Sequence, residues 1–408
     1  MSLIDHLDDH NLWVGFYDKK ADQGYLRGNI SSEIFHYIRQ KRYLPVVERI
    51  RAGQGLSIPV KKRIAKVASS KKRIVYSLPE DEANVLKLLT WLMIRRYDSS
   101  LSDNLYSFRP GKTIKTALNR ILSGAQIDDC YSYKLDVSNY FNSIHIPTLL
   151  PMLRELFSDD PQLYEFAAQM LTEPHVVDDG NVVVDEKGVM AGMPTAVFFA
   201  NLYLSDLDRA FENMPGVVYC RYSDDIIVFA QEKDVLEKCK SMIHEHLRRF
   251  RLEVNPDKEV ETEPGEKWTF LGISYLKGEI DISDISFKKM KGKMRRKARR
   301  IQRWKDANGK EVWMAARAFI KHFNRKLYTS EDPHQINWAR WYFPLITTDR
   351  TLKELDAYMQ DCIRFCATGR RTKSRYDFRY SDMKDQGYRS LVHEWYAFKQ
   401  LGHLPEKE

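Results

Sequence analysis

Two adjacent carboxylates, Asp224 and Asp225, stand between two apolar, β-prone runs in the segment VVYCRYSDDIIVFA, residues 217–230. Because so few residues separate the runs, we expect a β-hairpin with both carboxylates at its tip. Two like charges held this close repel each other unless a cation lies nearby. The pattern is therefore typical of a metal site, although aspartate is also a common residue of plain turns.

A third carboxylate, Asp136, ends a strand-like run in KLDVSNYFNSIH, residues 134–145. Phosphoryl transfer assisted by two Mg²⁺ ions needs oxygen ligands from separate strand ends. Asp136 together with Asp224 and Asp225 would supply that set. Taken alone, Asp136 is equally consistent with the N-cap of a following helix.

The elements that would position these carboxylates are short strands and amphipathic helices, which predict an α+β fold. Strands are expected at 131–137, 217–222, 226–230 and 268–275, with a Val-rich hairpin over 175–188. Helices are expected at 80–97, 148–171, 196–211, 233–251 and from 287 onward. The first 70 residues indicate helix and loop, with a helix over 31–50 broken at Pro45 and a basic loop over 61–73.

Five motifs in order resemble the palm motifs of prokaryotic reverse transcriptases: DVSNYF from 136, GMPTAVFFANLYL from 192, YSDD from 222, NPDK from 255 and FLG from 270. Upstream, the stretch from KKRIVYSLPEDEAN to YSFRPGKT is similar to the fingers of group II intron-type enzymes. The resemblance implies a right-hand polymerase fold in three parts. These are an N-terminal helical extension at 1–59, fingers and a palm with an antiparallel sheet at 60–275, and a basic, mainly helical thumb or C-terminal domain at 276–408.

The resemblance implies catalytic roles for four residues. Asp136, Asp224 and Asp225 would hold two Mg²⁺ ions, with Mn²⁺ as a substitute. Lys258, in NPDK, would face the departing pyrophosphate and protonate it. The turn formed by Phe270, Leu271 and Gly272 would contact the primer.

The resemblance also implies a nucleotide site. Phe141 matches the aromatic position beneath the sugar of the incoming nucleotide, where it would exclude a 2′-hydroxyl; a core aromatic is the alternative. Lys72, Arg73 and Arg109 match the cations that offset the charge of the triphosphate. A solvated surface role is the alternative for each of these cations.

The second palm motif departs from the family pattern. Group II intron enzymes have G-x-P-Q-G where this chain has Gly192, Met193, Pro194, Thr195 and Ala196. Thr195 replaces an amide that could reach the template–nucleotide pair, so we expect either a dedicated template or synthesis that depends little on a template. A stand-alone enzyme with this change is most similar to the defence-associated and abortive-infection reverse transcriptases of bacteria. That similarity implies an antiphage role, with a non-coding RNA, a neighbouring-gene protein or a second copy as partner.

Positive charge is concentrated at the C-terminal end of this 408-residue chain. Residues 281–408 hold 29 Lys and Arg against 16 Asp and Glu, and residues 288–305 hold eleven Lys and Arg and no acid. The apolar residues of this segment recur at helical spacing, which predicts a helix with one packed face. Lys291, Arg295 and Arg299 are its candidate contacts to the phosphates of a template–primer duplex, and a solvated helix is the alternative.

Other features limit the location of the protein. The sequence has no run of 18 apolar residues and no signal-peptide pattern, which predicts no membrane span. Its five scattered cysteines favour a reducing cytoplasm.

We interpret the chain as an RNA-directed DNA polymerase that makes cDNA from an RNA template, a DNA primer and dNTPs. Two alternatives stay open. One is template-independent or protein-primed DNA synthesis on the same fold, and the other is a non-catalytic RNA-binding scaffold of a defence complex.

Overall fold

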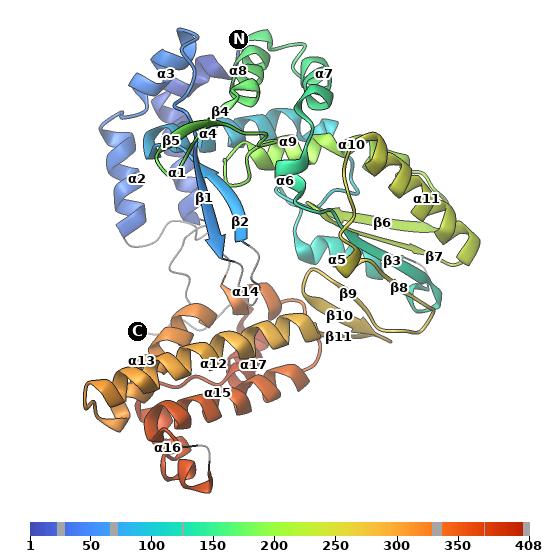
Figure 1. The fold of residues 1–408 in the computed structure, drawn as a ribbon. Helices are drawn as coiled ribbons and strands as arrows, with labels where there is room; N and C mark the ends of the chain where they lie inside the picture. The colour runs from blue at the N-terminus through green and yellow to red at the C-terminus, as the bar shows by residue number, and fades with distance from the viewer. Residues whose placement is uncertain (23–28, 66–71, 125, 329–336, 371, 403–408) are drawn as a thin grey trace. The chain divides into compact units, whose positions relative to one another are not determined.

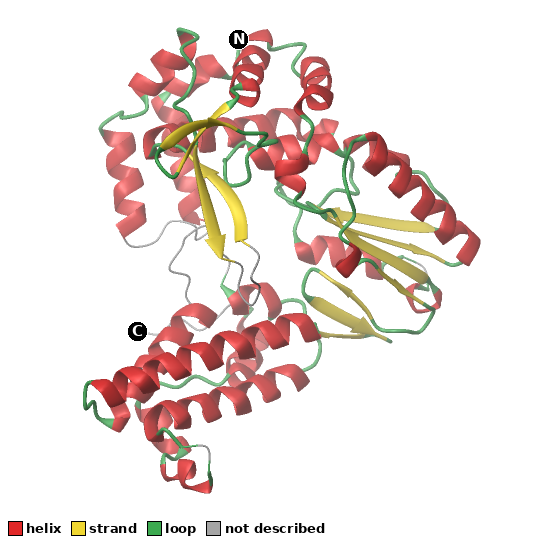
Figure 2. Ribbon diagram, in the orientation of Figure 1, coloured by secondary structure: helices red, strands yellow, loops and turns green. Residues whose placement is uncertain are grey.

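The computed structural model describes residues 1–22, 29–65, 72–124, 126–328, 337–370 and 372–402 (Figure 1). These residues form two compact units, Met1–Glu266 and Lys267–Glu408. Helices and mainly antiparallel sheets occur together (Figure 2), which confirms the predicted α+β class. The three-part division at 59/60 and 275/276 stays a prediction.

The first unit contains a four-stranded antiparallel sheet in the order β6-β7-β3-β8. Its strands are β3 (Tyr131–Asp136), β6 (Val217–Tyr222), β7 (Asp225–Ala230) and β8 (Val260–Thr262). The predicted β6–β7 hairpin, residues 217–230, is confirmed and is called the aspartate hairpin below. The continuous apolar run of β7 is buried, and helix α11 (Lys233–Arg249) packs against β7 and β3.

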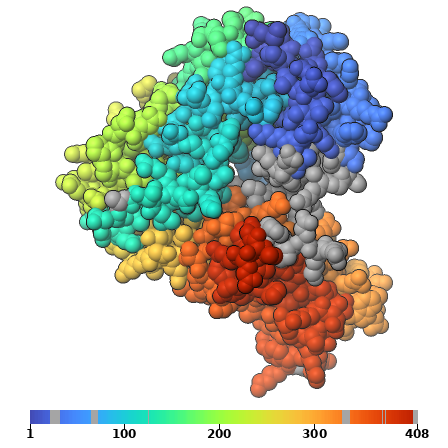
Figure 3. Space-filling view, turned by 180° about the vertical axis from the view of Figure 1, so that it is seen from behind, coloured from blue at the N-terminus to red at the C-terminus, as the bar shows by residue number. Residues whose placement is uncertain are grey.

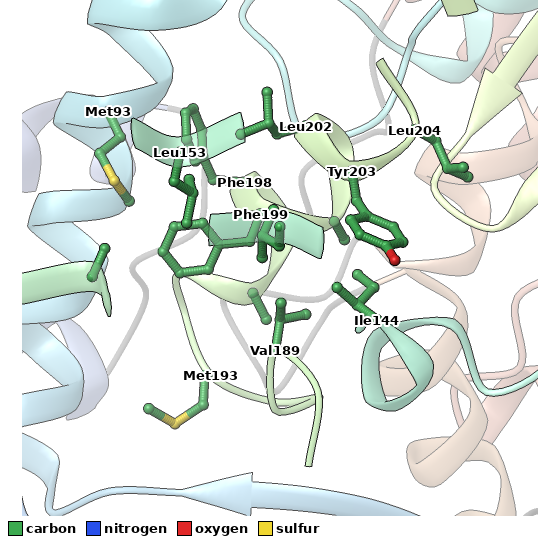
Figure 4. Packing of buried hydrophobic residues seen from close by; sticks show 14 of the residues in the cluster. Met93, Ile144, Leu153, Val189, Met193, Phe198, Phe199, Leu202, Tyr203 and Leu204 are labelled. Carbon is green, nitrogen blue, oxygen red and sulfur yellow. The ribbon is translucent and has the colours of Figure 1, made fainter. Parts of the chain in front are cut away.

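Helices share with this sheet a core of buried hydrophobic residues, part of which is drawn in Figure 4. Its helices are α4 (Glu80–Tyr97), α7 (Ile146–Leu156), α8 (Pro161–Thr172), α9 (Ala196–Tyr203) and α10 (Ser205–Ala210). Met93 of α4, Leu153 of α7 and Phe198 of α9 are all buried in the cluster drawn in Figure 4. The helix predicted at 80–97 has those bounds, whereas those predicted at 148–171 and 196–211 are each divided in two. Asp160 explains the first division, because its side chain caps α8 by accepting from Leu163 N at 3.1 Å.

Three helices, α1 (His10–Asp22), α2 (Asn29–Arg39) and α3 (Leu44–Arg51), precede the first strand. The helix predicted over 31–50 is interrupted as expected, but the interruption lies at residues 40–43, before Pro45. Pro45 lies in the first turn of α3, where its missing N–H costs no intrahelical hydrogen bond, so it starts a helix instead of breaking one. N-terminal residues and residues near 100 share one face of this unit (dark blue and cyan in Figure 3), consistent with the contact between α1 and α4.

A second four-stranded sheet of this unit has the order β2-β1-β4-β5. Its strands are β1 (Val60–Ala65), β2 (Lys72–Ser77), β4 (His175–Asp178) and β5 (Asn181–Val184). The hairpin predicted over 175–188 is confirmed by the β4–β5 pairing. The basic loop predicted over 61–73 is partly wrong, because Val60–Ala65 pair with Lys72–Ser77 as antiparallel strands. Residues 66–71 of that predicted loop lie outside the described residues.

The second unit joins a three-stranded sheet to a helical bundle. The strands are β9 (Trp268–Phe270), β10 (Ile273–Leu276) and β11 (Glu279–Ile282). The helices are α12 (Asp284–Ala307), α13 (Val312–Tyr328), α14 (Trp338–Tyr342), α15 (Arg350–Thr368), α16 (Tyr380–Asp385) and α17 (Leu391–Leu401). The single strand predicted at 268–275 is instead a hairpin, because Leu271 and Gly272 both have positive φ, at 51° and 85°.

The basic helix predicted from 287 begins three residues earlier, where Ser283 caps it. Its predicted apolar stripe, Met290, Met294, Ala298 and Ile301, is buried. None of the helices in the described ranges is long and apolar enough to cross a membrane.

Candidate active site

The three predicted carboxylates lie together at one end of the β6-β7-β3-β8 sheet. Asp136, the last residue of β3, pairs in register with Asp225, the first residue of β7. Asp224 lies in the turn, and its carbonyl accepts from Val137 N at 3.1 Å. One carboxylate oxygen from each aspartate lies within 4.8 Å of the other two. The structure therefore brings the predicted triad together.

The turn that carries Asp224 is fixed from behind by backbone contacts. Ser223 has a φ of 61°, an uncommon conformation for a residue other than glycine. Its N–H donates to Ser107 Oγ at 2.9 Å, and Ser107 Oγ in turn donates to Asn201 Oδ1 at 3.0 Å. These bonds hold the strained residue in place, and with it the aspartates that follow.

An ion pair that we did not predict from the sequence completes this support. Arg221 and Asp208 are both fully buried, and the guanidinium makes two hydrogen bonds to the carboxylate. Arg221 also donates to the carbonyls of Ser223 at 3.1 Å and Asn201 at 2.9 Å. Tyr219 donates its hydroxyl to the same carboxylate at 3.0 Å. An arginine inside an otherwise apolar strand, with an aspartate in the preceding helix, is the signal that could have indicated this pair.

The electrostatics of the triad favour a bound cation. Burial raises the pKa of Asp225 to about 6; Lys134 opposes this shift, whereas Asp224 and Asp136 add to it. Burial, and next the charge of Asp136, also raise the pKa of Asp224. Converging carboxylates whose ionised forms are disfavoured in this way fit a hard divalent cation, which prefers oxygen ligands.

Besides Lys134, two further cations act on this cluster. Lys258, at the end of a short 3₁₀ turn (Pro256–Lys258), donates to Asp136 Oδ2 at 2.6 Å. The turn is joined to β3 because Asn255 N donates to the carbonyl of Asp136 at 2.8 Å. Arg73, an exposed residue of β2, acts electrostatically on Asp224 and lowers its pKa against the larger effect of burial. The structure thus brings Lys258 and Arg73 close to the triad. Lys72 is the exposed first residue of β2, the strand that carries Arg73.

Phe141 lies in the short helix α6 (Tyr140–Ser143), five residues after Asp136. Its ring is half-buried and meets the ring of Tyr140 edge-on, with centroids 5.8 Å apart. Asn142, which we did not predict, joins three segments. Its Nδ2 donates to the carbonyl of Ile74 at 3.3 Å, and its Oδ1 accepts from Ala191 N at 2.9 Å. Asn142 thus connects α6 both to β2 and to the loop of the second palm motif.

That loop packs tightly on β2. Tyr76 N donates to the carbonyl of Ala191 at 2.8 Å. Gly192 has a φ of 103°, and a Cβ there would lie 2.8 Å from the carbonyl oxygen of Tyr76. Thr195 is only 1% exposed, and its hydroxyl contacts Met170 Sδ at 4.0 Å. Because its side chain is enclosed in the core, we do not retain Thr195 as a nucleotide contact.

Arg109 also has a different environment from the one expected. Its guanidinium is buried, and it bonds the Asp98 carboxylate at 2.8 Å and the carbonyls of Ser102, Leu105 and Asp98. These contacts fold the segment before α5 (Ile114–Leu122) onto itself. With its donors engaged in this way, Arg109 has a structural role, and we do not retain it as a triphosphate ligand.

The predicted primer and template contacts belong to the second unit. Phe270 is fully buried, and Leu271 and Gly272 form the turn between β9 and β10. A Cβ on Gly272 would lie 2.8 Å from Tyr342 Oη and 3.0 Å from Ser286 Oγ, so the bundle holds this turn closely.

The three predicted cations of α12 gather beside one ring. The ammonium of Lys291 lies 4.7 Å from the ring centroid of Tyr358 on α15, and Arg295 and Arg299 act electrostatically on the Tyr358 hydroxyl. Arg295 and Arg299 are exposed.

The family follows from a comparison with known families. Residues 60–275, more than half of the chain, match the family described as reverse transcriptase (RNA-dependent DNA polymerase). The chain belongs to the reverse transcriptase family. This domain indicates an RNA-directed DNA polymerase, a nucleotidyltransferase, and enzymes with it use divalent metal ions. No curated protein matches the sequence.

Solved structures of telomerase from Candida tropicalis are similar at low identity. The apo form is 12% identical, with 84% of this chain and 62% of that chain covered and a TM-score of 0.49. A form truncated from the C-terminal domain is 14% identical, with 58% of each chain covered and a TM-score of 0.45. This chain thus spans about three fifths of the length of those telomerase chains. Since a TM-score below 0.5 does not establish a common fold, the family assignment rests on the match to residues 60–275.

Proposed function

We propose that this reverse transcriptase copies an RNA template into DNA at the Asp136–Asp224–Asp225 site. The observation that supports this reaction most directly is the convergence of three carboxylate oxygens within 4.8 Å inside a reverse transcriptase domain, from the end of β3, the start of β7 and the turn before it. In the reaction, the primer 3′-hydroxyl oxygen bonds to the α-phosphorus of a dNTP while the bond to pyrophosphate breaks.

Four residues of the site, the three aspartates and Lys258, have a proposed part in the chemical step. The three aspartates would hold two divalent ions, for which we propose Mg²⁺ with Mn²⁺ as a substitute; these ions supply Lewis-acid stabilisation of the phosphates when bound. Lys258 would give a proton to the pyrophosphate, because its ammonium already reaches the same group of carboxylates.

The proposed nucleotide contacts are Arg73, Lys72 and Phe141. Arg73 and Lys72 project from β2 as exposed cations, suited to the triphosphate. Phe141 would lie beneath the sugar and exclude a 2′-hydroxyl. On the second unit, we propose that Phe270, Leu271 and Gly272 shape the primer contact, and that Lys291, Arg295 and Arg299 contact the duplex backbone.

For the biological role, we propose antiphage defence in the bacterial cytoplasm, on the strength of the motif pattern alone. The expected partners are an RNA template, which can be a dedicated non-coding RNA, a DNA primer and dNTPs. A neighbouring-gene protein or a second copy of the chain is a further candidate partner. Loss of phage protection in cells that carry the Asp224→Asn/Asp225→Asn protein would support this role, and unchanged protection would contradict it.

Primer extension with sequencing of the product tests the proposed reaction. The purified chain is given a primed RNA of defined sequence, dNTPs and Mg²⁺. A DNA product complementary to the RNA supports the proposal. Random or homopolymeric DNA, or DNA joined to the protein itself, would instead support template-independent or protein-primed synthesis. The absence of any product, together with RNA binding, would support a scaffold.

A further inference from the structure

Helix α12 has basic side chains on two opposite sides. At about 100° per residue, Lys291, Arg295 and Arg299 share one side, whereas Lys293, Lys297 and Arg300 point about 170° away from them. The first side lies against Tyr358 of α15. A duplex lying along that side cannot also reach the other three cations, so they need a separate explanation.

The second set of cations lies toward α13, although Lys297 is also within electrostatic reach of Cys366 on α15. His322 of α13 is within electrostatic reach of Lys297 and Arg300, and Lys293 is within reach of Lys326. We call these residues the α12–α13 face: Lys293, Lys297, Arg300 and Trp304 of α12, with His322 and Lys326 of α13. Its cations form no ion pair with any described residue, and α13 contains no acidic residue at all.

Burial and neighbouring like charges both act against the charged forms of this face. Burial lowers the pKa of Lys293, and the like charges of Lys326, Lys289 and Arg296 lower it further. The pKa of His322 falls to about 4 for the same two reasons. Lys293 and Lys297 are half-buried, and Arg300 and Lys326 are exposed. Like charges gathered with no carboxylate among them are typical of a surface that binds a polyanion.

An aromatic side chain shares this side of α12. Trp304 is 41% exposed, and at about 100° per residue it points in the same direction as Lys293 and Lys297, about one turn beyond Arg300. Cations next to an exposed aromatic ring are the combination that binds single-stranded nucleic acid, because the cations meet phosphates and the ring stacks on a base.

We propose that the α12–α13 face binds a single-stranded segment of RNA, separate from the template–primer duplex assigned to the α15 side of the same helix. Lys293, Lys297 and Arg300 contact its phosphates, and Trp304 stacks on one base. The inference rests on the proposed function only in taking RNA as the nucleic acid. The face would thus hold a part of the RNA that is not being copied.

Two matched triple variants of the full chain test the proposal. Lys293→Gln/Lys297→Gln/Arg300→Gln changes the α12–α13 face, and Lys291→Gln/Arg295→Gln/Arg299→Gln removes the same charge from the opposite side. Binding of a labelled single-stranded RNA and of an RNA–DNA duplex is measured over a range of salt concentrations. We expect the first variant to lose on the order of tenfold or more in affinity for the single strand, with a salt slope smaller by about 2, and to keep its affinity for the duplex. The second variant should lose affinity for the duplex and keep its affinity for the single strand.

A stacking test is independent of charge. Trp304→Ala should lower the affinity for the single strand roughly 5- to 150-fold with an unchanged salt slope. Trp313→Ala is the control, because Trp313 is about as exposed as Trp304 but points about 180° away from His322 on α13. Equal losses for both ligands in both triple variants, or no effect of Trp304→Ala, would overturn the proposal.

Two further measurements separate this proposal from its rivals. If phosphatidylserine vesicles bind the wild type and not the first triple variant, while single-stranded RNA binds both equally, the face is a membrane site and the proposal fails. The Asp224→Asn/Asp225→Asn protein should bind the single strand like the wild type. Absence of dNTP incorporation by a wild type that still binds RNA through this face would refute the proposed function alone.

Discussion

The side chains of Arg221 and Asp208 form a fully buried ion pair, with Arg221 Nε 2.7 Å from Asp208 Oδ1 and Nη2 2.5 Å from Oδ2. The same guanidinium donates to the carbonyl of Ser223, the residue immediately before Asp224. Arg221 therefore ties the turn of the aspartate hairpin to α10, which positions the carboxylates without touching them.

Removal of one partner of this ion pair should be costly. Asp208→Asn leaves the buried Arg221 charge uncompensated, so we expect the free energy of unfolding in urea to fall by about 3–5 kcal/mol. Adding Arg221→Met removes that charge, and the double variant should recover most of the lost stability because no buried charge remains.

The activity of the double variant distinguishes a positioning role from a purely structural one. Asp208→Asn/Arg221→Met still lacks the donor to Ser223, so we expect its rate of dNTP incorporation at saturating Mg²⁺ to stay at least about tenfold low, a loss of 1.4 kcal/mol. If stability and incorporation recovered together, the pair would hold the fold and not the turn.

Lys258 is expected to affect both the metal and the leaving group. Lys258→Gln removes the ammonium from Asp136, so divalent ions should bind more tightly in a calorimetric titration. Loss of a proton donor should also lower the incorporation rate at saturating Mg²⁺ by roughly 10²-fold. Lys134→Gln is the control, since Lys134 acts on Asp225 only through its charge. A rate defect that disappears at high Mg²⁺ would show that Lys258 is only a counter-ion.

Gly272 should be intolerant of a side chain. Gly272→Ala places a Cβ 2.8 Å from Tyr342 Oη in a residue with a φ of 85°. We expect a loss of about 2–4 kcal/mol in the free energy of unfolding, from backbone strain together with the steric clash. Adding Tyr342→Phe relieves the closest contact but leaves the Ser286 contact at 3.0 Å and the backbone strain, so thermal melts should show partial recovery. Full recovery would mean that neither the left-handed backbone nor the Ser286 contact carries strain there.

His322 provides a pH-dependent signal for the second unit. Burial and the charges of Lys297, Lys326, Arg325 and Arg300 lower its pKa from 6.5 to about 4. Between these values the unfolded chain binds more protons than the folded one, so the contribution of His322 to stability is complete near pH 7 and is lost as the pH falls toward 4. An NMR titration should give the low pKa, and thermal melts of His322→Gln should depend less on pH over this range. Bound single-stranded RNA should raise the pKa, because phosphates favour the imidazolium.

The strands that carry or flank the three aspartates, β3, β6 and β7, could be predicted from the sequence because their patterns are local. The run at 226–230 is apolar throughout and β-prone, and only three residues separate it from the run at 217–222, so the hairpin and the place of Asp224 and Asp225 follow. Asp136 was found for a similar reason, since it ends a strand. Helix α4 has clear apolar spacing along its whole length.

The environment and backbone conformation of single residues could not be predicted in the same way. Nothing local distinguishes an arginine that faces a triphosphate from Arg109, which turns back on Asp98. Burial of Thr195 depends on Met170, which is distant in sequence. The positive φ of Leu271, a residue that rarely adopts it, divided a strand that looked continuous. In each case, tertiary contacts outweighed the local pattern.

Single-turnover incorporation of a dNTP on a primed RNA tests the central claim most directly. It compares the wild type with the Asp224→Asn/Asp225→Asn protein, which keeps the shape of both side chains and removes their charge. Our account predicts that the wild type extends the primer, and that the variant folds, binds the RNA and adds no nucleotide above background. Extension by the variant at the rate of the wild type would contradict the assignment of these aspartates as the metal-holding site of a polymerase.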